Sequence, residues 1–158
     1  MDEKTHAEAQ RIVTRLCVGR TVTAVGVVAE PVLTLGAYLA AGYPGIPGPP
    51  EAYLHIEAGS HTSGPNVPAE PSSAAMSLAE LAGVVVSLRG LPVTEASLGF
   101  PSPHLTLRFA NGTALHIEGH DPTHEPWRIA AGDWSIYALA NDDVTWGVPH
   151  PALVRGVA

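Results

Sequence analysis

The motif Leu-His-Ile-Glu occurs twice in this chain of 158 residues, at 54–57 and at 115–118. Each copy ends a series of matching segments that follow one another in the same order. The matches are Leu-Thr-Leu at 33–35 and 105–107, and Gly-x-x-Val-Thr at 19–23 and 90–94. Ordered matches of this kind within one chain indicate an internal repeat. The sequence therefore predicts one structural unit that occurs twice.

Each unit is predicted to begin with an amphipathic helix. Thr5-x-x-Glu8 and Ser77-x-x-Glu80 both fit a capping box, in which the hydroxyl and the carboxylate accept hydrogen bonds from backbone N–H groups at the helix start. Apolar residues then recur at helical spacing. They are Ala9, Ile12, Val13 and Leu16 in the first unit, and Leu78, Leu81, Ala82, Val85 and Leu88 in the second.

Strands are predicted after each helix. They cover 21–28, 32–39 and 52–57 in the first unit, and 93–98, 104–109 and 113–118 in the second. The Pro/Gly run Gly42–Pro50 is predicted to be a long loop, because proline has no N–H to donate within a sheet. Residues 133–148 are predicted to form an extra hairpin that turns at 141–143. All the tryptophans, Trp127, Trp134 and Trp146, fall in the C-terminal third and are expected to close the core.

These elements predict an α+β fold, in which an αβββ unit is duplicated and antiparallel sheets carry the helices on one face. The extra β-hairpin follows at the C-terminal end. The predicted organisation is a first unit at 1–58, a linker at 59–75, a second unit with the hairpin at 76–148 and a tail at 149–158. The length suits one compact, pseudo-symmetric domain.

The hairpin within the second unit determines where its histidines point. A two-residue turn at Asn111-Gly112 would place His116 opposite Leu107 and mix polar with apolar side chains on each face. A three-residue loop, 110–112, with Gly112 at positive φ pairs apolar residues with apolar residues. Each Leu-His-Ile-Glu motif is then predicted to bury Leu and Ile and to turn His and Glu to the opposite face.

The polar side chains on and near these strands are the candidate site. The ligand-binding candidates are His55, Glu57, His104, His116, Glu118, His120 and His124. Two histidines and one carboxylate also form a known metal-ligand set, which His116, Glu118 and His120 would supply. An extended strand separates His116 from His120 by roughly 13 Å, so a divalent metal is the less favoured alternative. No cofactor is favoured and no catalytic residue is assigned.

Charge excludes several classes of partner. The formal net charge is −7, with Lys and Arg together numbering 8. A nucleic-acid-binding protein needs a basic stripe that replaces phosphate counterions, and an acidic chain is repelled by anionic membranes. The expected partner is therefore a protein or a small molecule, with neither nucleic acid nor membrane involved. The sequence leaves the oligomeric state open.

Short motifs add little chemistry. Cys17 is the single cysteine, which excludes an intrachain disulfide, and its place beside the first helical stripe predicts a buried, inert thiol. No nucleophile elbow, phosphate-binding loop or dinucleotide fingerprint occurs. The polar, acidic start differs from a signal peptide, so a cytoplasmic location is expected. The preference for arginine over lysine, with abundant Ala, Gly, Pro and Val, suggests a GC-rich bacterial genome.

Two stretches, residues 16–25 and 105–119, carry a resemblance to known proteins. Their strand pattern resembles the opening β-rich segment of formamidopyrimidine-DNA glycosylases. However, Met1 is followed by Asp2 and Glu3 where that family has proline and glutamate, and the basic groove and zinc finger are missing. Glycosylase activity is therefore not carried over. The second unit also resembles small uncharacterised actinobacterial proteins, some of them similar to immunity proteins encoded beside toxins.

The sequence thus leaves two functions open, and whether the chain is an enzyme stays undecided. The first is a non-catalytic binding protein, immunity-like, that uses the open polar sheet face. The alternative is a small-molecule enzyme, such as an isomerase, cyclase or hydrolase, that uses the second-unit His/Glu cluster for acid–base or metal-assisted chemistry.

Overall fold

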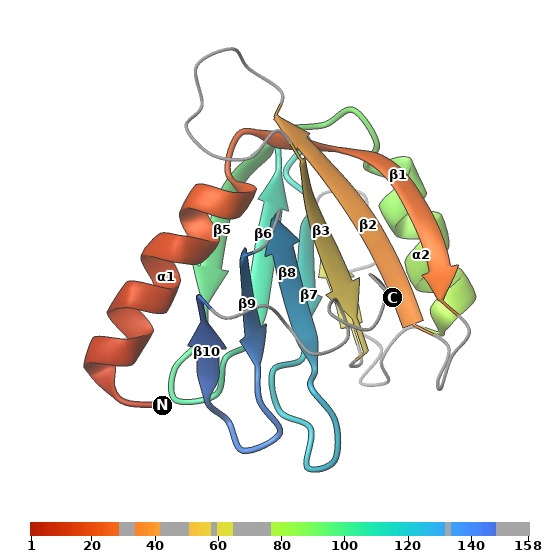
Figure 1. The fold of residues 1–158 in the computed structure, drawn as a ribbon. Helices are drawn as coiled ribbons and strands as arrows, with labels where there is room; N and C mark the ends of the chain where they lie inside the picture. The colour runs from red at the N-terminus through yellow and green to blue at the C-terminus, as the bar shows by residue number, and fades with distance from the viewer. Residues whose placement is uncertain (29–33, 42–50, 58–59, 65–76, 132–133, 148–158) are drawn as a thin grey trace, which may run out of the picture.

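The computed structural model describes residues 1–28, 34–41, 51–57, 60–64, 77–131 and 134–147. In this part of the chain, two helices and ten strands form an α+β fold with two antiparallel sheets (Figure 1). Neither of these helices is long and apolar enough to cross a membrane. The predicted loop at 42–50, the predicted tail at 149–158 and most of the predicted linker lie outside the described residues.

The predicted αβββ order is found in both halves. The first half contains α1 (Glu3–Cys17), β1 (Arg20–Val28), β2 (Thr34–Ala41), β3 (Glu51–Ile56) and β4 (Ser60–Ser63). The second contains α2 (Leu78–Ser87), β5 (Val93–Leu98), β6 (Leu105–Phe109), β7 (Ala114–Ile117), β8 (Trp127–Ala131), β9 (Trp134–Ala138) and β10 (Val144–Trp146). The predicted C-terminal hairpin is β9–β10. Strands β4 and β8 were not predicted, and β4 lies inside the segment predicted as a linker.

These two unpredicted strands join the halves. The larger sheet has the order β1-β2-β3-β8-β9-β10, and the smaller has the order β4-β7-β6-β5. Strand β4 therefore leaves the first half to pair with β7, and β8 leaves the second half to pair with β3. Neither sheet belongs to one half alone, so the halves form a single folded body.

The helices are also exchanged between the halves. Helix α1 packs mainly against β5 and contacts β9 and β10, whereas α2 contacts β1 and β2 (Figure 1). Both helices thus touch the larger sheet and contribute to one common core. The smaller sheet shares this core, and its strands β6 and β7 lie behind β8 and β3 in Figure 1.

The two helix starts differ from each other. Ser77 caps α2 as predicted, because its Oγ accepts a hydrogen bond from the backbone N–H of Glu80 at 3.2 Å. The capping box predicted at Thr5 is wrong, because α1 begins earlier. Its cap is Asp2, whose carboxylate accepts a hydrogen bond from the Thr5 N–H at 2.7 Å. Asp is as good a cap as Ser, and its charge also favours the positive end of the helix dipole.

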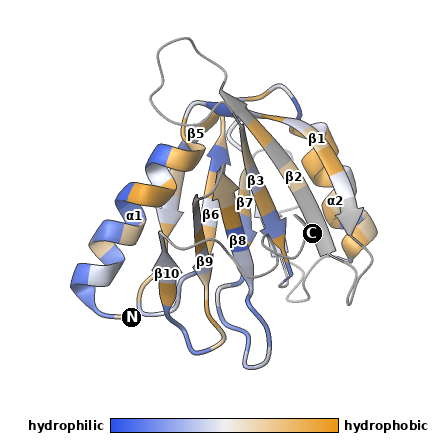
Figure 2. Ribbon diagram, viewed as in Figure 1, coloured by the Kyte–Doolittle hydropathy of each residue, from blue (hydrophilic) through white to orange (hydrophobic). Residues whose placement is uncertain are grey.

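Apolar residues of both sheets and both helices meet in the core. The Leu and Ile of each Leu-His-Ile-Glu motif are buried, as predicted. Hydrophobic residues line α1 along one side while hydrophilic ones occupy the rest of its surface (Figure 2). Trp127 is fully buried, and its indole N–H donates a hydrogen bond to the Pro103 carbonyl at 2.8 Å. This bond links β8 of the larger sheet to the loop that precedes β6 of the smaller one.

Equivalent residues of the two halves bond to each other where the halves meet. The N–H of Gly19 donates to the Val93 carbonyl at 2.8 Å, and the N–H of Gly90 donates to the Val22 carbonyl at 3.1 Å. Both glycines have positive φ, 81° and 78° respectively. A bulge follows Val22 in β1 and Val93 in β5. The two halves therefore have the same order of elements, a bulge at the same position and equivalent hydrogen bonds to each other. Their origin by duplication stays a prediction.

Register corrects one of the sequence matches. Leu35 pairs with Ile56, and Leu105 pairs with Ile117 in the same way. Leu105 thus takes the place of Leu35 and not of Leu33, so the Leu-Thr-Leu match was shifted by two residues. The predicted hairpin is confirmed: Leu107 pairs with Leu115, and Gly112 has φ 85°.

Glycine substitutions test the role of positive φ where the halves meet. Neither Gly90 nor Gly83 has an atom within 4 Å of an added Cβ, but only Gly90 has positive φ. We expect Gly90→Ala to lower the free energy of unfolding by about 1–2 kcal/mol, because a Cβ strains the backbone in the left-handed region. Gly83→Ala, inside α2, should raise it by about 0.5–1 kcal/mol. Urea denaturation of both variants measures this; equal effects would contradict the assignment of strain at Gly90.

Candidate functional site

The outer face of the smaller sheet is polar, and no described helix or strand covers it. Its side chains alternate with core residues along β4 to β7, and each is exposed or half-buried. The face consists of Ser63, Glu95, Ser97, Thr106, Arg108 and His116, with His104 and Glu118 at its end. We call these residues the polar face. Glu95 and Arg108 are cross-strand partners with their charged atoms 3.8 Å apart.

His116 lies at the centre of the polar face, between two hydroxyl groups. Its Nε2 is 2.8 Å from Ser63 Oγ on β4, and its Nδ1 is 3.0 Å from Thr106 Oγ1 on β6. In the neutral ring, one nitrogen donates and the other accepts, and a hydroxyl serves either role. The ring is therefore held in one orientation by the strands on both sides.

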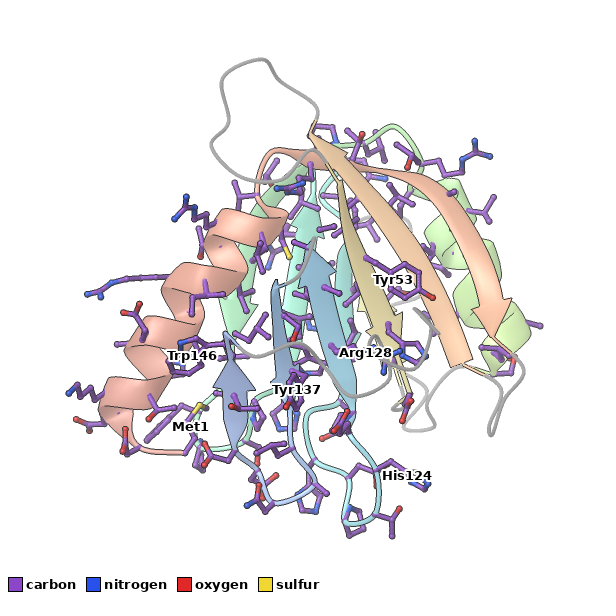
Figure 3. All side chains as sticks on the ribbon, in the orientation of Figure 1. Met1, Tyr53, His124, Arg128, Tyr137 and Trp146 are labelled. Atoms are coloured by element: carbon purple, nitrogen blue, oxygen red, sulfur yellow. The ribbon has the colours of Figure 1, made fainter. Side chains whose placement is uncertain are left out.

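The first Leu-His-Ile-Glu copy has a different environment. His55 is only 5% exposed, although it points away from the core, whereas Glu57 is exposed. The polar sheet face, which was predicted to be open, is therefore covered at His55. The unpredicted strand β8 makes β3 an interior strand and places Arg128 opposite His55. Tyr53, Arg128 and Tyr137 lie over the same face of the larger sheet (Figure 3).

His104 and Glu118 meet at the end of the polar face. His104 Nδ1 is 3.0 Å from Glu118 Oε1 and 2.9 Å from the backbone N of Gly119, which donates to it. Nδ1 cannot accept from Gly119 and donate to Glu118 at once, so only one of the two contacts is a hydrogen bond in a given tautomer of the ring. Residue 119 must be glycine, because a Cβ there would collide with the backbone of Pro103.

His120 does not continue this row but turns to the β9–β10 connection. Its Nδ1 is 2.7 Å from Asp142 Oδ1. The hydrogen bond that His120 donates to the Asp142 carboxylate raises the pKa of His120 and lowers the pKa of the Asp142 carboxyl. The terminal amino group of Met1 donates to the Asp142 carbonyl at 3.3 Å. Sequence reasoning identified Asp142 as a turn residue, which its φ of 62° supports, but missed this pairing.

The remaining candidate, His124, stands apart from the others. It lies in the loop between β7 and β8 (Figure 3), with Nδ1 3.6 Å from Asp121 Oδ1. The side chains of the predicted metal set point to three different partners: His116 to hydroxyls, Glu118 to His104 and His120 to Asp142. In the described part of the chain, no group of three potential metal ligands comes together.

The buried thiol of Cys17 agrees with the prediction. Burial raises its pKa to about 12, although nearby Arg20 acts in the opposite direction. Such a thiol is protonated at neutral pH and is a poor nucleophile. Arg20 is itself fully buried at a core position of β1, close to the C-terminal end of α1, where the helix dipole favours a cation.

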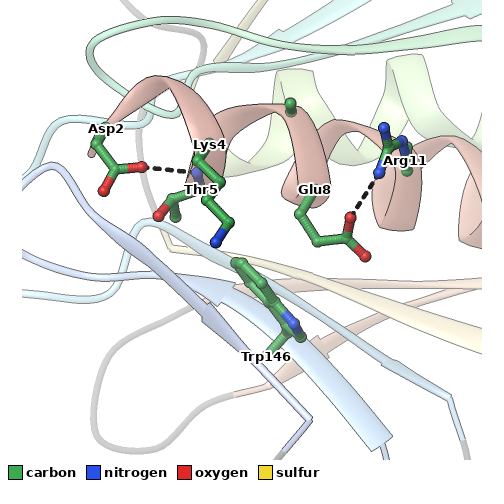
Figure 4. A pocket seen from close by; sticks show the side chains of 7 residues that line it. Asp2, Lys4, Thr5, Glu8, Arg11 and Trp146 are labelled. Atoms are coloured by element: carbon green, nitrogen blue, oxygen red, sulfur yellow. Dashed lines mark hydrogen bonds and ion pairs between the residues drawn. The ribbon is translucent and has the colours of Figure 1, made fainter.

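A cleft between α1 and β10 was not predicted (Figure 4). Its volume is about 560 Å³, within the range of ligand-binding pockets. Side chains of α1 form one wall and the Trp146 ring of β10 forms the other. Sequence analysis had identified Trp146 as a core residue, and it is half-buried. The cleft depends on the packing of α1 beside β10, which no local sequence signal reveals.

Comparison with known proteins finds no matching protein family, no matching curated protein and no matching solved structure. The interpretation of this site therefore rests on its geometry.

The His120–Asp142 pair predicts a pH-dependent stability. A raised histidine pKa stabilises the fold below its unfolded value of about 6.5, and this contribution is lost as pH rises through the folded pKa. The lowered Asp142 pKa stabilises the fold above about 3.9, and this contribution is lost as pH falls through the folded pKa. His120→Gln should therefore reduce the free energy of unfolding more at pH 5.5 than at pH 8.5.

Urea denaturation at both pH values measures this difference. The matched control is His120→Gln in an Asp142→Asn background, since asparagine tolerates the positive φ at this position. The pH-dependent difference should disappear there. If it persists, another group causes it.

Proposed function

We propose that this chain is a non-catalytic binding protein that engages a protein partner through the polar face. The observation that carries this proposal is the position of His116, held between Ser63 and Thr106 at the centre of an uncovered sheet. Side chains that are already ordered lose little conformational entropy when a partner binds. The polar face is therefore suited to recognition before any partner arrives.

The position of the polar face on the outside of a sheet supports a protein partner over a small molecule. Small-molecule sites are concave and mostly apolar, whereas protein interfaces are broad and include a polar rim with many hydrogen bonds. The polar face lies on the outside of a sheet and offers hydroxyls, an imidazole and both signs of charge. The net charge of −7 supports a partner other than nucleic acid. In biological terms, we propose a bacterial, cytoplasmic protein with an immunity-like role.

The alternative, a small-molecule enzyme, rests on the contact between Ser63 and His116. A distance of 2.8 Å suits proton transfer from a hydroxyl to an imidazole. However, the third group is the Thr106 hydroxyl, which has no negative charge to stabilise an imidazolium ion. Both strands also present these groups on the outer face of a sheet and not inside the core. Binding is the function that this geometry supports better.

Alanine substitution at His116 tests the proposal. We expect His116→Ala to weaken partner affinity about tenfold or more while changing the free energy of unfolding by under about 1 kcal/mol. Partners are sought by co-expression with the products of adjacent genes, and affinity is measured by isothermal titration calorimetry. His124→Ala, at an exposed histidine outside the polar face, is the matched control.

Two outcomes would contradict the proposal. Equal affinities of wild type and His116→Ala for a purified partner would exclude the polar face as its binding surface. Turnover of a small-molecule ester that is lost in both His116→Ala and Ser63→Ala would instead favour the enzymatic alternative.

A further inference from the structure

The outer edge of β10 carries backbone groups directed away from its own sheet. β10 is the last strand of the larger sheet, so β9 is its single neighbour there. The N–H of Leu139 donates to the Asp143 carbonyl at 2.8 Å, and the N–H of Gly147 donates back to β9 at 3.0 Å. Hydrogen-bonded residues alternate along an antiparallel strand. The backbone groups of Val144 and Trp146 therefore point away from β9.

Trp146 carries the second backbone donor that points outward from this edge. The Val144 N–H is already bonded to the Asp143 carboxylate at 2.9 Å. Within the described residues, the Trp146 N–H has no hydrogen-bond partner beyond the sheet edge. The carbonyl oxygens of Val144 and Trp146 alternate with it as acceptors. The edge thus offers the acceptor–donor–acceptor pattern that another strand requires.

The cleft places a helix beside this edge at a distance that leaves room for a guest. Helix α1 contacts β10, yet a volume of about 560 Å³ stays open between them. A strand that pairs with β10 would lie about 4.8 Å from it. The Trp146 ring forms an apolar wall of this space (Figure 4).

The charges on the α1 wall indicate what such a guest would carry. Glu8 is paired with Arg11 at 2.8 Å, and the Asp2 carboxylate caps the helix by accepting from Thr5. Lys4 also lines the cleft, and it has no ion-pair partner among the described residues. Its ammonium group extends from α1 toward the Trp146 ring (Figure 4). A carboxylate is its natural complement.

We propose that the cleft binds an extended, acidic peptide segment of a protein partner, which adds as a strand to the free edge of β10. Backbone hydrogen bonds to Val144 and Trp146 hold the segment, an apolar side chain packs on the Trp146 ring, and an acidic side chain pairs with Lys4. This mode of recognition is strand addition, in which backbone bonds give affinity and alternate side chains give specificity. It uses a surface separate from the polar face, so either proposal can fail alone.

Peptide selection on the full chain provides the probe. Random dodecapeptides displayed on phage are selected against the wild-type protein, and enriched sequences are synthesised. We expect alternating apolar residues with at least one Asp or Glu, and slower hydrogen exchange at the Trp146 amide when peptide is bound. N-methylation of the peptide amides that face β10 should weaken binding about tenfold or more, whereas N-methylation of the intervening amides should not.

Variants of the protein separate the two recognition elements. Trp146→Leu keeps the backbone donor and Trp146→Pro removes it, so the proline variant should bind at least about tenfold more weakly than the leucine variant. Lys4→Glu should weaken acidic peptides about threefold to tenfold. Arg89→Glu, an identical charge change at an exposed residue that does not line the cleft, should have no effect.

Three results would overturn the proposal: no enriched peptide, equal binding of the N-methylated and unmodified peptides, or equal binding by the leucine and proline variants. If Trp146→Pro fails to fold, the N-methylated peptides and Lys4→Glu still decide the question on folded protein.

Discussion

The reciprocal hydrogen bonds between Gly19 and Val93 and between Gly90 and Val22 connect the two halves at equivalent residues. Each bond requires the chain to leave a helix and enter a strand through a residue of positive φ, which glycine adopts without strain. This crossing brings the first strand of each half against the helix of the other half. Because neither helix covers its own strands, neither half buries its apolar face alone.

The fourth strand of each half, β4 or β8, pairs with a strand of the other half. This exchange explains why the two Leu-His-Ile-Glu copies differ in exposure. β8 pairs with β3 and is itself followed by a hairpin, so β3 is interior to a six-stranded sheet. β4 pairs with β7 and ends the smaller sheet. His55 therefore lies opposite Arg128 and is buried, whereas His116 lies between two hydroxyls and is partly exposed. The difference in exposure between the copies arises from tertiary pairing and not from their identical residues.

The features predictable from sequence were those that depend on near neighbours. The β6–β7 register followed from matching apolar stripes, and Gly112 satisfied its loop. The α2 cap followed from Ser77 and Glu80, but the stronger cap at Asp2 went unrecognised because it preceded the expected motif. β4 and β8 were missed since short strands in Ser-, Gly- and Trp-containing segments have weak periodicity. Their identity depends on β7 and β3, which are distant in sequence.

Candidate site residues show the same limit. Sequence placed His104, His116 and Glu118 on one face, because strand alternation determines that face. The sequence could not predict the hydrogen bond between His120 and Asp142, because a contact between two loops depends on how these loops lie at one end of the molecule. The cleft beside Trp146 was hidden for a related reason, since a tryptophan near the end of a hairpin resembles a core residue in any local window.

Charge neutralisation links the polar face and the cleft. In a chain of net charge −7, unpaired carboxylates repel both one another and any acidic partner. On the polar face, Glu95 is next to Arg108; beside the cleft, Glu8 is paired with Arg11. These acidic groups are balanced within their own surfaces, so a partner meets hydroxyls, backbone groups and Lys4 without strong repulsion. Local neutrality within an acidic protein is thus the physical condition on which both of the proposed binding modes depend.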